Sequence, residues 1–144
     1  AACVNGITMK RMAKGTFEVD LRPLPFEGAE PEWKLGRMSI GKQFSGDLNA
    51  TSKGQMLSAM TDTAGSAGYV AIERVSGVLN GKQGTFVLQH NGFMNRGVPA
   101  LSVAVIPDSG TGELEGLEGD FKIIIEGGLH RYEFSYRLPN PCSD

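Results

Sequence analysis

Asn80-Gly81 is the feature that most constrains the fold of this chain. An Asn-Gly pair between two alternating runs is the strongest short-range signal for a β-hairpin, because a type I′ turn needs φ > 0 at both central residues. The flanking runs, 69–79 and 82–92, alternate in this way. A two-residue loop also fixes the register of the strands. The expected cross-strand pairs are Leu79–Lys82, Val75–Phe86, Glu73–Leu88 and Ala71–His90.

This register sorts the side chains of the hairpin into two faces. One face carries Tyr69, Ala71, Glu73, Val75, Phe86, Leu88 and His90. The other face carries Val70, Ile72, Arg74, Val87, Gln89 and Asn91. Alternation alone does not decide which face lines the interior, because the outside of an oligomeric barrel is also apolar.

Most of the remaining chain also alternates with a period of two, which is typical of half-buried strands. For residues 53–65 a helix is the alternative, but the segment is short and is closed by Gly on both sides, which favours a strand. Gly41 and Gly46 are expected to bend a long second strand, and residues 51–54 are expected to turn the chain into the third. The predicted strands are 12–22, 35–50, 55–61, 69–79, 82–92, 101–106, 121–126 and 129–138.

Eight strands joined by short turns predict an all-β fold, an antiparallel up-and-down β-barrel. Closing the meander into a barrel removes the two bare edges that an open sheet would expose. A chain of 144 residues fits one domain. We therefore expect an N-terminal tail over 1–11, a barrel domain over 12–138 and a C-terminal tail over 139–144.

The composition of the chain argues against several classes of binding partner. The net charge is −2 and the basic residues are scattered, which argues against binding to nucleic acid or to an anionic membrane surface. No apolar run approaches the roughly 18–20 residues that cross a bilayer. With two His and two Cys, a metal cluster is not expected, and no cofactor is predicted.

The two cysteines, Cys3 and Cys142, lie near opposite ends of the chain. If the first and last strands are neighbours, a disulfide between them is feasible; the alternative is two free thiols on loose tails. The chain does not open with Met and shows no charged-then-apolar leader. We expect a cytoplasmic protein, with a processed secreted form as the alternative.

Several motifs resemble those of the uncharacterised DUF3224 family, over about residues 12–138. They are GTFEV (15–19), KQFSGDL (42–48), TSKGQMLSA (51–59), GSAGYVAIERVSG (65–77), FVLQHNG (86–92) and PDSGTGELEGLEG (107–119). That family is similar to the allene oxide cyclase and dirigent barrels. The resemblance implies an eight-stranded and often oligomeric barrel.

Glu73 and His90 form the first candidate site. They are diagonal neighbours on one hairpin face, about 6–8 Å apart at Cβ. A carboxylate beside an imidazole orients its tautomer, and partial burial would bring the Glu pKa toward neutral, so the pair can transfer protons. The apolar wall around it would be Tyr69, Phe86 and Leu88. The alternatives are a structural ion pair or two exposed residues, and if the facing is inverted the lining residues are Arg74, Gln89 and Asn91.

Glu18 is a second candidate, and it rests on the resemblance. Residues 17–20, Phe-Glu-Val-Asp, resemble a Tyr-Glu-Ile-Asn run of allene oxide cyclases whose Glu works in the cavity. Asp20 stands where that run has an amide, and an ionised carboxylate cannot donate a hydrogen bond. The alternative is a charged outer face opposite Phe17 and Val19.

These observations leave three classes of function. The first is a cofactor-independent isomerase, cyclase or lyase that acts on a small apolar or phenolic molecule by carboxylate/His proton transfer. The second is a non-catalytic binding protein for such a molecule, and the third is a purely structural oligomer. Apolar side chains on both hairpin faces exceed what a small lumen absorbs, so we expect a homo-oligomer.

Overall fold

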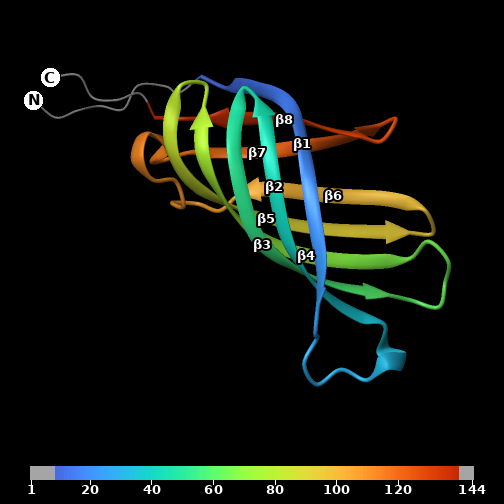
Figure 1. Cartoon of the computed structure of the whole chain (residues 1–144). Coiled ribbons are helices and arrows are strands. Elements are labelled where there is room, and N and C mark those ends of the chain that lie inside the picture. Colours follow the sequence, from blue (N-terminus) through green and yellow to red (C-terminus); the bar gives the residue numbers. More distant parts are fainter. Residues whose placement is uncertain (1–8, 140–144) are drawn as a thin grey trace, which may run out of the picture.

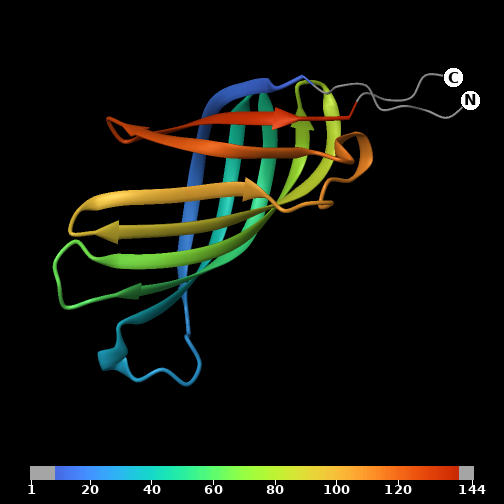
Figure 2. The same cartoon turned by 180° about the vertical axis from the view of Figure 1, so that it is seen from behind.

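The structure, a computed structural model, describes residues 9–139 and is a closed eight-stranded antiparallel barrel in chain order (Figures 1 and 2). The fold class predicted from the sequence is thereby confirmed. Within residues 9–139 the helical structure consists of two 3₁₀ turns, η1 (Pro31–Trp33) and η2 (Gly112–Leu114). The strands are β1 (Arg11–Leu24), β2 (Leu35–Gly46), β3 (Leu48–Met60), β4 (Ala67–Leu79), β5 (Lys82–Asn95), β6 (Val98–Val105), β7 (Glu118–Glu126) and β8 (Leu129–Arg137).

The β4–β5 hairpin has the predicted turn and register. Asn80 and Gly81 have φ values of 45° and 83°, both in the left-handed region that a type I′ turn requires. All four expected cross-strand pairs are present, including Glu73 opposite Leu88 and Ala71 opposite His90. The predicted strand over residues 55–61, preferred to a helix, corresponds to the second half of β3.

The second turn of the chain lies earlier than predicted. β2 ends at Gly46, where φ is 103°, and Leu48 already begins β3, so the expected strand over 35–50 and turn over 51–54 are wrong. Asp47 fixes this turn, because its carboxylate accepts a 2.9 Å hydrogen bond from the backbone N–H of Lys14. Residues 51–54 are paired strand, and Gly54 has a packing role described below.

The barrel interior is filled at the end that holds the β2–β3 and β4–β5 turns. Phe121 and Phe134 stack with ring centroids 4.1 Å apart, and Tyr132 meets Phe44 edge-on at 5.7 Å. The Tyr132 hydroxyl accepts a hydrogen bond from the Leu48 N–H and donates one to a backbone carbonyl. The connection between β6 and β7 adds Leu114 and Leu117, both buried. This half of the barrel is a packed core.

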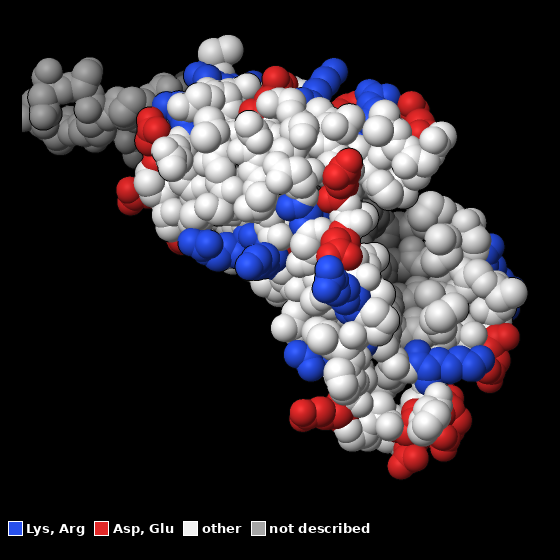
Figure 3. Space-filling view, in the orientation of Figure 1, with Lys and Arg blue, Asp and Glu red and all other residues white. Residues whose placement is uncertain are grey.

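The other end of the barrel is open. β6 and β7 share two ladder pairs, Val103–Phe121 and Ala104–Asp120, after which the β5–β6 and β7–β8 hairpins diverge (Figure 1). Inward-facing side chains there remain partly exposed, among them Leu101 at 46% and Ile125 at 66%. Figure 3 shows the molecule hollowed between these hairpins, and most of the visible wall carries no charge. The lumen therefore has a filled half and an unfilled half.

The two ends of the barrel chain lie side by side, because Arg11 pairs with Tyr136 between β1 and β8. This meets the condition set for a Cys3–Cys142 disulfide, but both cysteines lie outside the described residues. Most of the two expected tails lies outside them as well. Within residues 9–139, no helix has the length and apolarity of a membrane-spanning segment.

Replacing Gly81 by Val should lower the free energy of unfolding by about 1–3 kcal/mol, because φ > 0 is strained for a β-branched residue. The site isolates backbone strain, since a Cβ at Gly81 would meet nothing within 4 Å. Gly41→Val is the matched control, because its added Cβ would meet nothing nearer than 4.0 Å and its φ is not positive. Equal urea midpoints for the two variants would contradict the turn assignment.

Candidate functional site

A cluster of four polar side chains lies inside the barrel, where the packed core meets the unfilled half. Lys42, Ser52, Glu73 and His90 come one each from β2, β3, β4 and β5. The ladders bring them together, since Lys42 pairs with Ser52 and the partners of Glu73 and His90 also face inward. The cluster thus depends on the register of four neighbouring strands.

The carboxylate of Glu73 is the centre of the cluster. Its Oε1 lies 2.6 Å from His90 Nε2 and accepts a 2.8 Å hydrogen bond from Lys42 Nζ. Its Oε2 accepts a 2.6 Å hydrogen bond from the Ser52 hydroxyl. Glu73 is fully buried, and the Lys42 side chain is 8% exposed. Both carboxylate oxygens are therefore bonded, as a buried charge requires.

Two local features make room for this cluster. Gly54 lies opposite Glu73, and a Cβ there would come within 2.0 Å of the Ile72 carbonyl oxygen and 2.7 Å of Glu73 Cβ, so no larger residue fits. Phe17 and Phe44 lie beneath Lys42, whose Nζ is 5.1 Å and 5.9 Å from their ring centroids. The rings offer the buried ammonium group cation–π contacts.

Glu73 is ionised at neutral pH. Burial by itself raises its pKa, but the hydrogen bond with His90, the charge of Lys42 and the hydrogen bonds from Lys42 and Ser52 together lower it to about 2. The expectation that burial would bring this pKa toward neutral is wrong, because sequence reasoning had not placed Lys42 or Ser52 beside the carboxylate. Glu73 consequently does not take up a proton near pH 7; it holds and polarises its neighbours.

His90 is oriented by Glu73. An ionised carboxylate can only accept hydrogen bonds, so the neutral imidazole carries its proton on Nε2 and leaves a lone pair on Nδ1. Nδ1 has no hydrogen-bond partner among residues 9–139. It is nevertheless not a fully buried atom, because within that range the fully buried side-chain nitrogen or oxygen without a partner is Ser135 Oγ. Nδ1 therefore keeps some accessible surface although His90 as a whole is 4% exposed.

Tyr69 borders the same space on the side of the open end. Its ring centroid lies 6.3 Å from that of His90, and its ring lies against Gly92, where a Cβ would come within 2.4 Å of Tyr69 Cε1. Burial, and secondly the negative charge of Glu73, raises the pKa of the Tyr69 hydroxyl. Tyr69 is thus a half-buried, protonated aromatic side chain beside the dyad.

The sequence-predicted residues fall into three groups. Glu73, His90 and Tyr69 face the lumen near its unfilled half, and the predicted contact between Glu73 and His90 is present. Phe86 and Leu88 also face inward, but each is 1% exposed in the packed core. The residues on the outer face are Glu18, Arg74, Gln89 and Asn91, all exposed. The position that the allene oxide cyclase resemblance implied for Glu18, inside the cavity, is therefore not the one observed.

Sequence reasoning missed Lys42 and Ser52. A signal for Lys42 exists, because it alternates with Ile40 and Phe44, which puts a lysine on an apolar face. The misplaced turn hid Ser52, since a residue in a predicted turn is not expected to face the core. His130, next to the β7–β8 turn, lies half-buried with its ring centroid 5.2 Å from that of Phe17.

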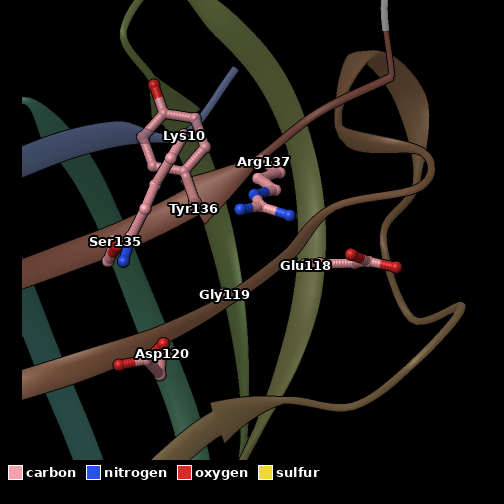
Figure 4. A pocket seen from close by; sticks show the side chains of 7 residues that line it. All are labelled: Lys10, Glu118, Gly119, Asp120, Ser135, Tyr136 and Arg137. Carbon is pink, nitrogen blue, oxygen red and sulfur yellow. The ribbon is translucent and has the colours of Figure 1, made fainter. Parts of the chain in front are cut away.

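Two hollows lie on the outside of the barrel. One, of about 280 Å³, lies over β7 and β8 and is lined by Lys10, Glu118, Gly119, Asp120, Ser135, Tyr136 and Arg137 (Figure 4). It mixes both signs of charge and so favours no ligand charge. The other, of about 530 Å³, is the outer groove, lined by Arg37, Gln55, Leu57, Val70, Ala71, Ile72, Gln89, His90 and Asn91. In the part of the chain that the structure describes, no three His, Cys, Asp or Glu side chains are grouped to hold a metal ion.

Comparison with known proteins places the chain. Residues 13–136 match the family model described as "Protein of unknown function (DUF3224)". The chain belongs to the DUF3224 family. It is similar to a crystal structure of a protein of unknown function from that family, from Shewanella oneidensis MR-1. The two are 48% identical, with a TM-score of 0.84, over 94% of this chain and 100% of the other. No protein with a curated description matches the chain.

Acid should destabilise the protein through Glu73. Because its folded pKa is depressed to about 2, its contribution is complete above the unfolded value near 4.5 and is lost as pH falls between these two values. The difference in unfolding free energy between wild type and Glu73→Gln should shrink by up to about 3 kcal/mol across that window. Urea denaturation at several pH values measures this.

Glu18→Gln is the matched control for this acid effect, because Glu18 is exposed on the outer face. Its unfolding free energy should run parallel to that of wild type over the same pH range. A Glu73→Gln curve that also runs parallel to wild type would show that Glu73 is not held ionised by its neighbours.

Proposed function

We propose that this DUF3224 barrel binds a small apolar or phenolic molecule in its unfilled half and that its Glu73–His90 pair transfers a proton, with His90 as the base and Glu73 as the carboxylate that orients it. In this role it is a cofactor-independent isomerase, cyclase or lyase. The observation that carries the proposal is a fully bonded, ionised carboxylate buried directly beneath an unfilled apolar lumen. The likeness to the allene oxide cyclase and dirigent barrels agrees with it, and a non-catalytic binding protein is the alternative.

The walls of the unfilled half support an apolar ligand. The apolar side chains that face inward there include Val19, Leu21, Met38, Ile40, Met56, Tyr69, Met94, Leu101, Ile123 and Ile125, and the polar side chains Ser58 and His130 face inward beside them. Three of these are methionines, whose flexible thioether side chains adapt to differently shaped partners. A ligand with a large apolar surface would gain most of its binding free energy here from leaving water.

The polar cluster is hard to explain as a stabilising feature alone. Replacing a buried ion pair with apolar side chains of similar volume is often neutral or stabilising, so Lys42 and Glu73 are not needed to close a barrel. A preorganised carboxylate–imidazole pair is useful where charge develops during a reaction, because it needs no reorientation at that moment. This favours catalysis over a purely structural role.

Binding in the lumen is testable with the neutral fluorescent probe N-phenyl-1-naphthylamine. Leu101→Glu places a charge on the lumen wall and should weaken probe binding by about tenfold or more. Val78→Glu is the matched control, because Val78 is exposed to a similar extent, 37% against 46%, but faces outward and does not line the outer groove. Loss of probe fluorescence in Val70→Glu with binding retained in Leu101→Glu would place the site in the outer groove instead.

Proton transfer is testable with 2-tetralone, a small bicyclic ketone with acidic C–H bonds. Wild-type protein should accelerate the exchange of these hydrogens in D₂O, followed by proton NMR. His90→Gln and Glu73→Gln should each slow that exchange by about 10²-fold, the scale of general base catalysis. Arg74→Gln, on the outer face, should not change it. Equal exchange rates for wild type and His90→Gln, with the probe still bound, would leave a binding protein without catalysis.

We also propose that the protein is a homo-oligomer and that a second copy covers the outer groove. Leu57, Val70 and Ile72 expose 43%, 52% and 48% of their surface from adjacent strands, and large exposed apolar patches are rare on monomers. Sedimentation velocity at micromolar concentration should give a multiple of 15.4 kDa. Ile72→Arg should shift that mass toward 15.4 kDa, and a wild-type mass of 15.4 kDa would refute the assembly.

A further inference from the structure

We infer that the ligand of the lumen carries an acidic O–H on a planar ring, as a phenol or an enol does, and that Nδ1 of His90 accepts its proton. This inference rests on the proposed function and specifies its ligand class. In this arrangement the ligand is the third member of a hydrogen-bonded chain that begins at Glu73 and passes through the imidazole ring.

The first step of the argument is the orientation of His90. Glu73 occupies Nε2 at 2.6 Å, and the carboxylate can only accept, so the imidazole turns its basic nitrogen away from Glu73. A carboxylate that fixes an imidazole in this way prepares the other nitrogen to take a proton from a partner within hydrogen-bond reach. The lone pair on Nδ1 is therefore the acceptor that the site presents.

The second step is that no described side chain occupies this acceptor. Ser52, the hydroxyl in the cluster, donates to Glu73 Oε2 at 2.6 Å and so lies on the carboxylate side. Tyr69, whose ring centroid lies 6.3 Å from that of His90, forms no hydrogen bond to the imidazole among residues 9–139. Because His90 is 4% exposed, an accessible Nδ1 without a protein partner is an acceptor meant for a bound molecule.

The third step is the charge balance of the transfer. The O–H bond of the ligand breaks, its electron pair stays on the ligand oxygen, and an N–H bond forms at Nδ1. The cluster then holds two cations, Lys42 and the imidazolium, against one carboxylate, and this net positive charge faces the new phenolate or enolate. Glu73, already ionised, stabilises the imidazolium without taking up the proton itself.

Tyr69 argues for a planar ring on the ligand. Its aromatic ring is half-buried beside His90 and packs against Gly92, where any side chain would collide with it. A flat aromatic wall beside the acceptor suits offset stacking with a ring that bears the O–H. The raised pKa of Tyr69 keeps its hydroxyl protonated and so able to donate.

The test compares 4-nitrophenol with 4-nitroanisole, which has the same ring and nitro group but a methyl ether in place of the O–H. Displacement of N-phenyl-1-naphthylamine should show 4-nitrophenol binding about tenfold more tightly, the scale of one hydrogen bond to a buried group. Bound 4-nitrophenol should absorb as the phenolate at a pH where the free compound is protonated. His90→Gln should abolish both effects, and Arg74→Gln, on the outer face and outside the outer groove, should preserve them.

The outcomes of this test separate the ligand class inferred here from the proposed function on which it rests. Equal affinities for the two compounds, or bound 4-nitrophenol that absorbs as the neutral phenol, would overturn the ligand class and leave the binding site standing. Failure of both compounds and of the probe to bind would overturn the proposed function itself. A ¹⁵N NMR spectrum of wild-type protein with the His90 proton on Nδ1 would overturn the acceptor assignment independently of any ligand.

Discussion

The burial of the Glu73 carboxylate is the constraint on which the interior of this barrel depends. An unpaired carboxylate at that depth would cost several kcal/mol, so the protein has to supply donors from every direction. It does so with a lysine, a hydroxyl and an imidazole drawn from three other strands. Because these donors meet only in one register, the charge also opposes any slip of β2–β5.

The same carboxylate marks the boundary between two kinds of interior. On one side aromatic side chains interlock at centroid distances of about 4–6 Å and leave no usable space. On the other side the inward-facing side chains are partly exposed and the strands diverge. A polar group at such a boundary can be desolvated enough to be reactive while one of its neighbours, His90, still reaches the lumen.

The sequence predicted the backbone better than the chemistry, for reasons visible in particular residues. Asn80-Gly81 is a local signal, so the hairpin and the pairing of Ala71 with His90 followed from it. The sequence does not distinguish the roles of Gly46 and Gly54. In the fold, Gly46 adopts a positive φ, whereas Gly54 avoids a clash with the neighbouring strand. The pKa of Glu73 could not be predicted from the sequence either, because Lys42 and Ser52 are distant from Glu73 in the sequence and only the fold brings them into contact.

The two-pair ladder between β6 and β7 has a consequence for how the barrel wall can move. Every other neighbouring pair of strands is joined by a longer ladder, so a widening motion will concentrate at this seam. Val103 spans it, lying opposite both His90 and Phe121. The weakest line in the wall therefore runs beside the strand that carries His90, and the wall can open there while each hairpin keeps its own pairing.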